Sequence, residues 1–170
     1  PAPSRSPEAA LGVLRAALAR DDAPAVYDAL DSDSSWSVIS LNSSEREMWR
    51  LASEHFPPGA REAQERRYAA AGAAAVPRAW FGSLGLHVPL RASLATGGAP
   101  RREDSADGSA VFVAASGARL RFEREADGTW AFSGLRADLA RRKEHAANAL
   151  AIMQRSADEY RRGGTTRRDR

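Results

Sequence analysis

The segment from Arg136 to Arg162 contains neither proline nor glycine, and its apolar residues recur at helical spacing. The apolar stripe consists of Leu139, Ala146, Leu150, Met153, Ala157 and Tyr160, and the opposite face of Arg141, Glu144, Asn148, Arg155, Asp158 and Arg162. This spacing predicts one helix, which Gly163-Gly164 would end because glycine readily adopts a left-handed backbone. Such a helix spans roughly 40 Å at about 1.5 Å per residue, so it would outreach a small sheet.

Three strand-like runs precede this helix: "AVFVAA", "ARLRFERE" and "TWAFSGL". Ser116-Gly117 separates the first two runs, and Ala126-Asp127-Gly128 separates the last two. Short β-branched or aromatic runs divided by glycine turns predict an antiparallel meander.

The turn lengths predict the register of this meander. A two-residue turn at Ser116-Gly117 would pair Val113 with Leu120. For the loop at 126–128, three residues with a left-handed Gly128 would pair Phe122 with Phe132. We favour this loop over one of two residues, which would put the apolar side chains of the two strands on opposite faces. The predicted apolar face carries Val111, Val113, Leu120, Phe122, Trp130 and Phe132, and the other face Phe112, Arg119, Arg121, Glu123 and Ser133.

Helix signals fill the part of the chain before the meander. Ser6-Pro7-Glu8 predicts the start of a first helix, and Asp22 precedes a short second one. Ser44-Glu45-Arg46-Glu47 fits a capping box, and the helix that it opens would end at Pro57-Pro58.

The remaining segments carry weaker signals. "DSDSS" at 31–35 predicts a turn. Residues 36–42 fit either a buried strand or another helical turn, and we favour the helix. Residues 59–75 predict a helix, 76–86 a short helix and 95–109 a polar loop.

Composition favours helices over a large β-sandwich. Hydrophobic residues, many of them alanine, make up 43% of the 170 residues, and aromatic residues only 7%. We therefore predict a single α+β domain over 6–162, with N-terminal helices packed on an antiparallel three- to four-stranded meander, followed by a long C-terminal helix. Its helical part covers about 6–86, the meander about 91–135 and the last helix about 136–162, with 1–5 and 163–170 as flexible termini.

Basic charge gathers at the C-terminal end. From Arg136 to Arg170 there are 10 Lys/Arg and 5 Asp/Glu, although the whole chain has a formal charge of only +3. Lys143 is the only lysine, and this arginine preference is typical of a high-GC bacterial genome. No aromatic residue interleaves the basic tail, so nucleic-acid binding is not favoured.

The N-terminal stretch "PAPSRSPE" is rich in proline and serine. Such a leader is typical of a chain that follows a removed export signal or a lipid-bearing cysteine. A chain that had been trimmed artificially could begin with the same residues. We expect an exported protein, periplasmic or anchored to a membrane through a lipidated N-terminus, with a cytoplasmic location as the alternative. The chain has no cysteine, which excludes disulfides and thiolate nucleophiles.

Patterns that carry catalysis or bind metals are scarce. His55, His87 and His145 lie in separate segments, without the spacing that places two ligands on one helical face. The segment "FGSLG" lacks the spacing of a nucleophile elbow, and "DSDSS" begins no calcium loop. We therefore expect no catalytic residue, metal or cofactor, and a protein that is not an enzyme.

Two sets of residues are candidates for binding. The partner-binding set consists of Trp80, Phe81, Arg141, Arg155 and Arg162. The pocket set consists of Trp130, Arg124, Phe132 and Phe122, in which Trp130 and Arg124 would form a cation–π pair.

The stretch "SPEAALGVLRAALARDDAPAVYDALD" and the strand "DGTWAFSGL" resemble small exported domains of the nuclear-transport-factor-two-like superfamily. The resemblance covers residues 6–35 and 109–135. It implies a cone-shaped fold in which N-terminal helices pack into a curved antiparallel sheet, and it leaves function open because the superfamily includes enzymes, ligand binders and assembly modules.

These observations lead to three functional hypotheses. The first is a non-enzymatic cell-envelope accessory or scaffold protein that binds a protein partner through the last helix or the Trp80–Phe81 region, with a membrane-associated protein as one candidate class of partner. The second is a small-molecule-binding or isomerase-like pocket protein. The third is a cytoplasmic nucleic-acid accessory.

Overall fold

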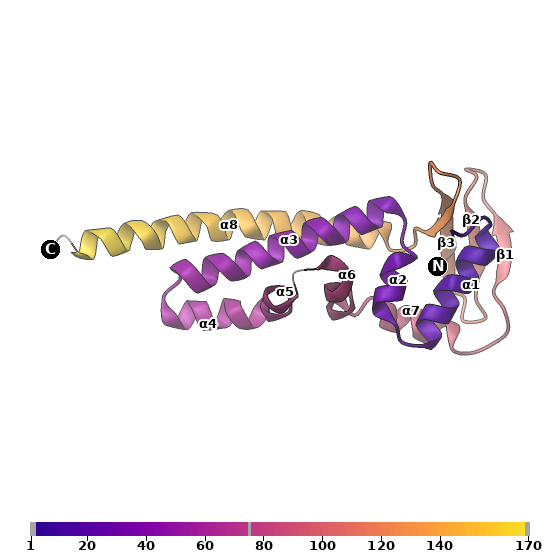
Figure 1. Ribbon diagram of the computed structural model, residues 1–170, viewed down its shortest axis with the longest axis horizontal. Coiled ribbons are helices and arrows are strands. Elements are labelled where there is room, and N and C mark those ends of the chain that lie inside the picture. The colour runs from indigo at the N-terminus through magenta and orange to yellow at the C-terminus, as the bar shows by residue number, and fades with distance from the viewer. Residues whose placement is uncertain (1–2, 75, 169–170) are drawn as a thin grey trace.

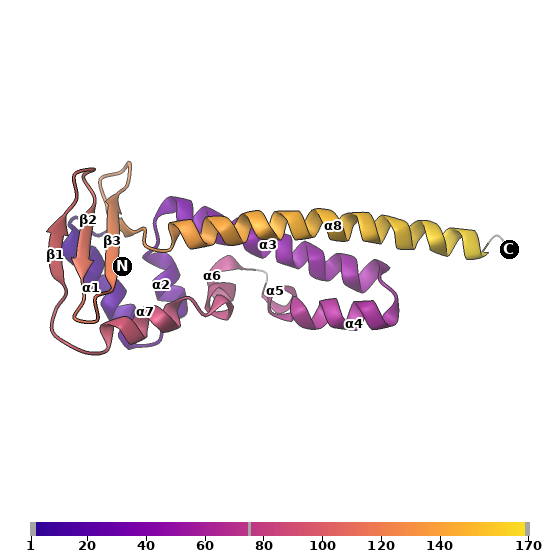
Figure 2. The same cartoon turned by 180° about the vertical axis from the view of Figure 1, so that it is seen from behind.

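The computed structural model describes residues 3–74 and 76–168, with side chains described up to residue 163. The chain forms a head at one end and an elongated arm that leads away from it (Figure 1; Figure 2). The head contains the sheet, α1 (Pro7–Ala19), α2 (Ala23–Asp28) and α7 (His87–Leu94), and the arm contains α3 (Ser32–His55), α4 (Pro58–Arg67), α5 (Ala69–Ala73) and α8 (Arg136–Arg168). Between them lie α6 (Pro77–Trp80) and the 3₁₀ helix η1 (Phe81–Leu84). The predicted α+β class is confirmed.

Both predicted N-terminal helices form with the predicted caps. The Ser6 hydroxyl accepts a hydrogen bond from the Ala9 amide at 3.1 Å, and the Asp22 carboxylate accepts one from the Ala25 amide at 3.0 Å. The apolar face of α1 packs against β3 and β4, which buries Leu14 completely. This helix therefore covers one face of the sheet.

The helix α3 is uninterrupted from Ser32 to His55, which confirms the helical interpretation of residues 36–42. The predicted turn at 31–35 was wrong, because Asp31 caps this helix by accepting a hydrogen bond from the Ser34 amide at 3.3 Å. The predicted capping box at 44–47 was also wrong. A serine followed by a glutamate marks a helix start only where the preceding chain is not helical, and here α3 already packs along α8.

After α3 the chain turns back along it as α4 and α5. Gly72 in α5 lies against Trp49 of α3 so closely that an added Cβ would be 2.7 Å from the indole ring. The next helices end at α7, where the meander was predicted to begin at about residue 91. That boundary was wrong, because Leu90 and Leu94 pack against the core on one side of a helix.

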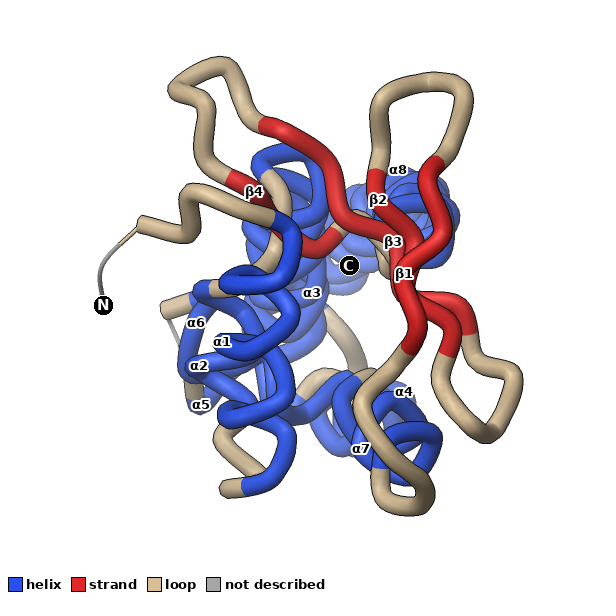
Figure 3. Tube along the Cα trace, turned by 90° about the vertical axis from the view of Figure 1, so that its right-hand side faces the viewer, coloured by secondary structure: helices blue, strands red, loops and turns tan. Residues whose placement is uncertain are grey.

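The sheet consists of β1 (Arg101–Asp104), β2 (Ala110–Val113), β3 (Arg119–Arg124) and β4 (Trp130–Phe132), antiparallel and in that order (Figure 3). The three predicted strands are confirmed as β2, β3 and β4. The first strand lies inside the predicted polar loop, and "RRED" has no apolar alternation that could have indicated it. It is an edge strand whose side chains remain largely exposed.

Three hairpin loops of one type join the strands. They contain Gly108, Gly117 and Gly128, whose φ angles are 81°, 84° and 83°. The residue before each glycine accepts a hydrogen bond from the amide that follows the glycine, at 3.1 Å from Ser109, 3.3 Å from Ala118 and 2.9 Å from Thr129. All three loops therefore have three residues and a left-handed glycine, as in a type I turn followed by a bulge.

This geometry confirms one half of the predicted register and corrects the other. Phe122 faces Phe132 and Arg124 faces Trp130, as predicted. The predicted pairing of Val113 with Leu120 was wrong, since Val113 faces Arg119. A loop one residue longer than assumed moves every side chain of β2 to the other face. The core face carries Ala110, Phe112, Leu120, Phe122 and Phe132.

The helix α8 runs beside α3 in the same direction (Figure 1). The ring of Phe56, just after α3, meets Tyr160 of α8 edge-on at a centroid distance of 5.1 Å. Within the predicted apolar stripe, Leu139, Ala146, Met153 and Ala157 are buried. The predicted stripe therefore forms the seam between the two long helices.

The predicted end of this helix was wrong. It continues through Gly163 to Arg168, because glycine permits a left-handed backbone without requiring it. The predicted flexible tail is thus helical as far as Arg168, whereas residues 1–2 and 169–170 lie outside the described residues. At the other end, the Ser4 carbonyl accepts a hydrogen bond from the Trp130 amide at 2.9 Å, which places the chain before α1 along β4.

Candidate functional site

The aromatic members of the predicted partner-binding set are in the interior. Trp80 is 2% exposed and Phe81 is not exposed at all. Phe81 packs against Tyr27 of α2 at a ring distance of 5.9 Å. The prediction that these two residues form a binding surface was therefore wrong. They fill the space between head and arm.

The three arginines of the same set are exposed, but they do not gather. Arg141, Arg155 and Arg162 are spread along α8. Arg141 forms an ion pair with Asp138 one turn earlier, at 3.2 Å. The exposure and the ion pair of Arg141 are those of a residue on a solvated helix face. Partner binding by the three arginines remains a prediction.

The predicted pocket set does not form one pocket. Phe122 and Phe132 are buried against each other at a ring distance of 5.4 Å, so the core fills the sheet face where the pocket was expected. Arg124 extends over the hairpin loop beside Gly128 and makes no cation–π contact with Trp130. Of the four, Trp130 borders a cavity on the head.

That cavity is a groove of about 880 Å³ on the head, bordered by α1, α2, the start of α3 and β4. We call it the Trp36 groove. Its large apolar side chains are Val13, Leu30, Trp36, Ile39 and Trp130, and small residues including Ala10, Ala16, Ala25 and Ala29 line the space between them. Trp36 is 66% exposed. An exposed tryptophan that lines a groove together with other large apolar side chains makes this groove a candidate binding surface.

The helix α3 presents Trp36 because its buried stripe lies on the other side. Ser34, Val38, Leu41 and Met48 are buried, and this leaves Trp36 and Ile39 on the face toward α1 and β4. Two hydrogen bonds hold the helix start in place: the amide and hydroxyl of Ser32 donate to the Glu125 carboxylate at 3.0 and 2.7 Å. The groove therefore stands on well-anchored elements.

A buried ion pair ties the same region to the arm. Asp31 is 1% exposed and accepts two hydrogen bonds from Arg136, the first residue of α8, at 2.6 and 2.8 Å. Arg136 also pairs with Glu123 of β3. This Asp31–Arg136–Glu123 joint connects α3, α8 and the sheet.

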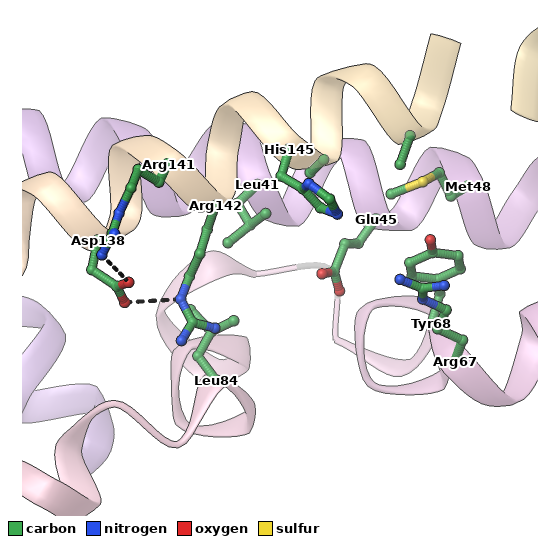
Figure 4. Close-up of a pocket in the computed structure, with 12 residues that line it drawn as sticks. Leu41, Glu45, Met48, Arg67, Tyr68, Leu84, Asp138, Arg141, Arg142 and His145 are labelled. Atoms are coloured by element: carbon green, nitrogen blue, oxygen red, sulfur yellow. Dashed lines mark hydrogen bonds and ion pairs between the residues drawn. The ribbon is translucent and has the colours of Figure 1, made fainter. Parts of the chain in front are cut away.

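A second cavity, of about 590 Å³, lies in the arm (Figure 4). It is lined by α3, α8, η1 and the junction of α4 with α5 at Tyr68. The Glu45 carboxyl group points into it, and burial raises the pKa of that group, against the opposing charges of Arg67 and Arg142. We call it the Glu45 cavity.

Sequence reasoning missed both cavities. Trp36 is the first residue of the helical turn favoured at 36–42, and the face on which it lies can be recognised only once α3 is known to run from Ser32 to His55. Glu45 had been assigned to a capping box. A helical wheel drawn over the full length of α3 would have separated both residues from the buried stripe.

Within residues 3–74 and 76–168, no group of three or more His, Asp or Glu side chains could hold a metal ion. The Ser83 hydroxyl in "FGSLG" donates to the Trp80 carbonyl at 2.7 Å, inside η1. The described helices include none that is long and apolar enough to cross a membrane.

Comparison of the chain with known protein families, curated proteins and solved structures found no match.

Proposed function

We propose that this protein is a non-enzymatic binding protein that captures a segment of a protein partner in the Trp36 groove. One observation carries the proposal: Trp36 exposes 66% of its surface in a groove that Val13, Ile39 and Trp130 also line. Tryptophan is among the residues that contribute most to protein interfaces, because it buries a large area at little entropic cost.

The composition of the groove indicates what kind of segment would fit. Alanines form the space between the large side chains, so an apolar side chain can be inserted there. Glu125 and Asp127 border the groove against a single lining arginine, Arg20, whereas Asp28 on the same border is already paired with Arg78 at 2.8 Å. An apolar segment with a basic residue beside it would match both features.

Site-specific photo-crosslinking in the native cells tests the proposal. A photoreactive amino acid replaces Ile39 at the groove, and in a matched variant it replaces Ile152, which is 56% exposed on α8. We expect a defined protein adduct from position 39 that position 152 does not give. Equal adducts from both positions, or none from position 39, would remove the groove from the account.

The proposal keeps the cell-envelope location expected from the Pro/Ser-rich leader, with attachment through a lipidated N-terminus. The intact mass of the protein purified from its native cells, together with fractionation, tests this part. A lipid mass on a cysteine preceding Pro1 would support it, and an unmodified cytoplasmic protein would contradict it.

A further inference from the structure

The Glu45 cavity contains a carboxylate without a partner. Glu45 is half-buried, and within the described residues it makes no hydrogen bond or ion pair. Figure 4 places its carboxyl group in the middle of the cavity, between Arg142 on one side and Arg67 on the other. A carboxylate that is partly removed from water needs a donor, and none of its neighbours supplies one directly.

The cations around it are not fully neutralised either. Arg67 lies over the Tyr68 ring at 5.5 Å from the centroid and forms no ion pair with any residue that the structure describes. Arg142 and Arg141 share a single carboxylate, Asp138, at 2.9 and 3.2 Å. The guanidinium groups of the cavity can therefore also accept the negative charge of a ligand.

The rest of the lining consists of His145 of α8, beside Glu45, and of apolar residues. Leu41 and Met48 of α3, Leu84 of η1, and Ala146 and Ala149 of α8 face the same space. Its volume of about 590 Å³ lies within the usual range of about 300 to 1,000 Å³ for small-molecule sites. The cavity thus offers one acid without a hydrogen-bond or ion-pair partner among the described residues, the guanidinium group of Arg67, two further guanidinium groups that share Asp138, and an apolar wall.

We propose that the Glu45 cavity binds a zwitterionic small molecule with an apolar side chain, of the class of apolar α-amino acids and short peptides. The ammonium group of the ligand donates to Glu45, its carboxylate accepts from Arg67 or Arg142, and its side chain packs on Leu41 and Met48. A simple anion would leave Glu45 unpaired beside it, and a simple cation would leave Arg67 without an acceptor. This site is separate from the Trp36 groove and does not depend on the proposed function.

Calorimetric titration of the full chain with four probes tests the charge pattern. L-leucine and L-leucyl-L-leucine carry both charges, N-acetyl-L-leucine only the negative one, and L-leucinamide only the positive one. We expect at least one zwitterion to bind, and both singly charged probes to bind about tenfold more weakly or worse. Binding of N-acetyl-L-leucine as tightly as the zwitterions, or no heat from any probe at millimolar concentration, would overturn the proposal.

Two variants assign the roles, and a third serves as the control. Glu45→Gln should weaken zwitterion binding about tenfold and leave N-acetyl-L-leucine unchanged. Arg67→Gln should weaken the zwitterions and N-acetyl-L-leucine but not L-leucinamide. Glu62→Gln on the exposed face of α4 should change nothing. Equal losses in the Glu45 and Glu62 variants would overturn the assignment, and the folded state of each variant is checked by circular dichroism.

Discussion

In the head, three hairpin loops of the same length carry a glycine at the same place, whereas in the arm two long helices of unlike sequence are aligned by contacts at their two ends. The loops of the head are specified by neighbouring residues, such as Asp127 and Gly128. The alignment of the arm depends on Asp31 and Arg136, which are 105 positions apart. Local turn chemistry therefore sets the register of the sheet, and distant side chains set the register of the helices.

The largest effect is expected in the core of the head. Phe122 is fully buried between Phe112 and Phe132, so Phe122→Ala should lower the free energy of unfolding by about 4 kcal/mol. Urea unfolding measures the change. Phe56→Ala at the far end of the arm serves as the comparison, and its cost should be clearly smaller because Phe56 is only half-buried. Equal costs would mean that the far end of the arm is packed as tightly as the head.

The next effect concerns the joint between head and arm. Asp31→Ala removes the buried partner of Arg136 and the cap of α3, and should cost about 2 kcal/mol, below the full range for buried pairs because Arg136 still reaches water. Asp33→Ala is the matched control, because Asp33 also pairs with Arg136, at 3.6 Å, but its side chain is 74% exposed. Thermal unfolding of the two variants side by side decides between a structural joint and a surface pair. Equal stability of the two would contradict the joint.

A smaller effect should separate two kinds of glycine. Gly128→Ala forces a side chain into a φ of 83° and should cost about 1 kcal/mol. Gly12→Ala, inside α1 with no atom within 4 Å of the added Cβ, should instead stabilise the protein by roughly 0.5–1 kcal/mol. Opposite signs in chemical denaturation are the expected result. Unchanged or increased stability of Gly128→Ala would mean that the left-handed conformation is not what Gly128 provides.

The smallest effect is a pH dependence in the arm. Burial raises the pKa of Glu45 in the folded state. The protein is therefore most stable, as far as this group is concerned, below the ordinary pKa of glutamate, where Glu45 is protonated in both states. This contribution to stability is lost as the pH rises through the folded-state pKa. Glu45→Gln should therefore raise the melting temperature more at neutral pH than at a pH below 4.5. An equal gain in melting temperature at both pH values would show that ionisation of Glu45 does not destabilise the folded protein.

Sequence reasoning predicted the parts of the fold that short-range rules control. The caps at Ser6 and Asp22, the last hairpin and the stripe on α8 were correct because each is written within a few neighbouring residues. The first predicted register failed although Ser116-Gly117 carries the same signal as Asp127-Gly128. Treating the two loops alike would have given the correct pairing.

The candidate sites could not be predicted in the same way. Trp80 and Phe81 look like an exposed aromatic pair, but helices distant in sequence bury them. Trp36 is exposed because the opposite face of α3 packs on α8. The surroundings of Glu45 include Arg67 and Arg142, which come from two other helices that are distant in sequence. Sites of this kind depend on packing between helices, which residue spacing does not contain.

The affinity of the Trp36→Ala variant for the partner that crosslinks at position 39 tests the central claim most directly. Loss of a tryptophan from the centre of an interface typically costs about 2 kcal/mol, so we expect binding to weaken roughly thirtyfold, while Ile152→Ala binds like the unchanged protein. An unchanged dissociation constant for Trp36→Ala would contradict the account and leave the exposed tryptophan without a role in binding.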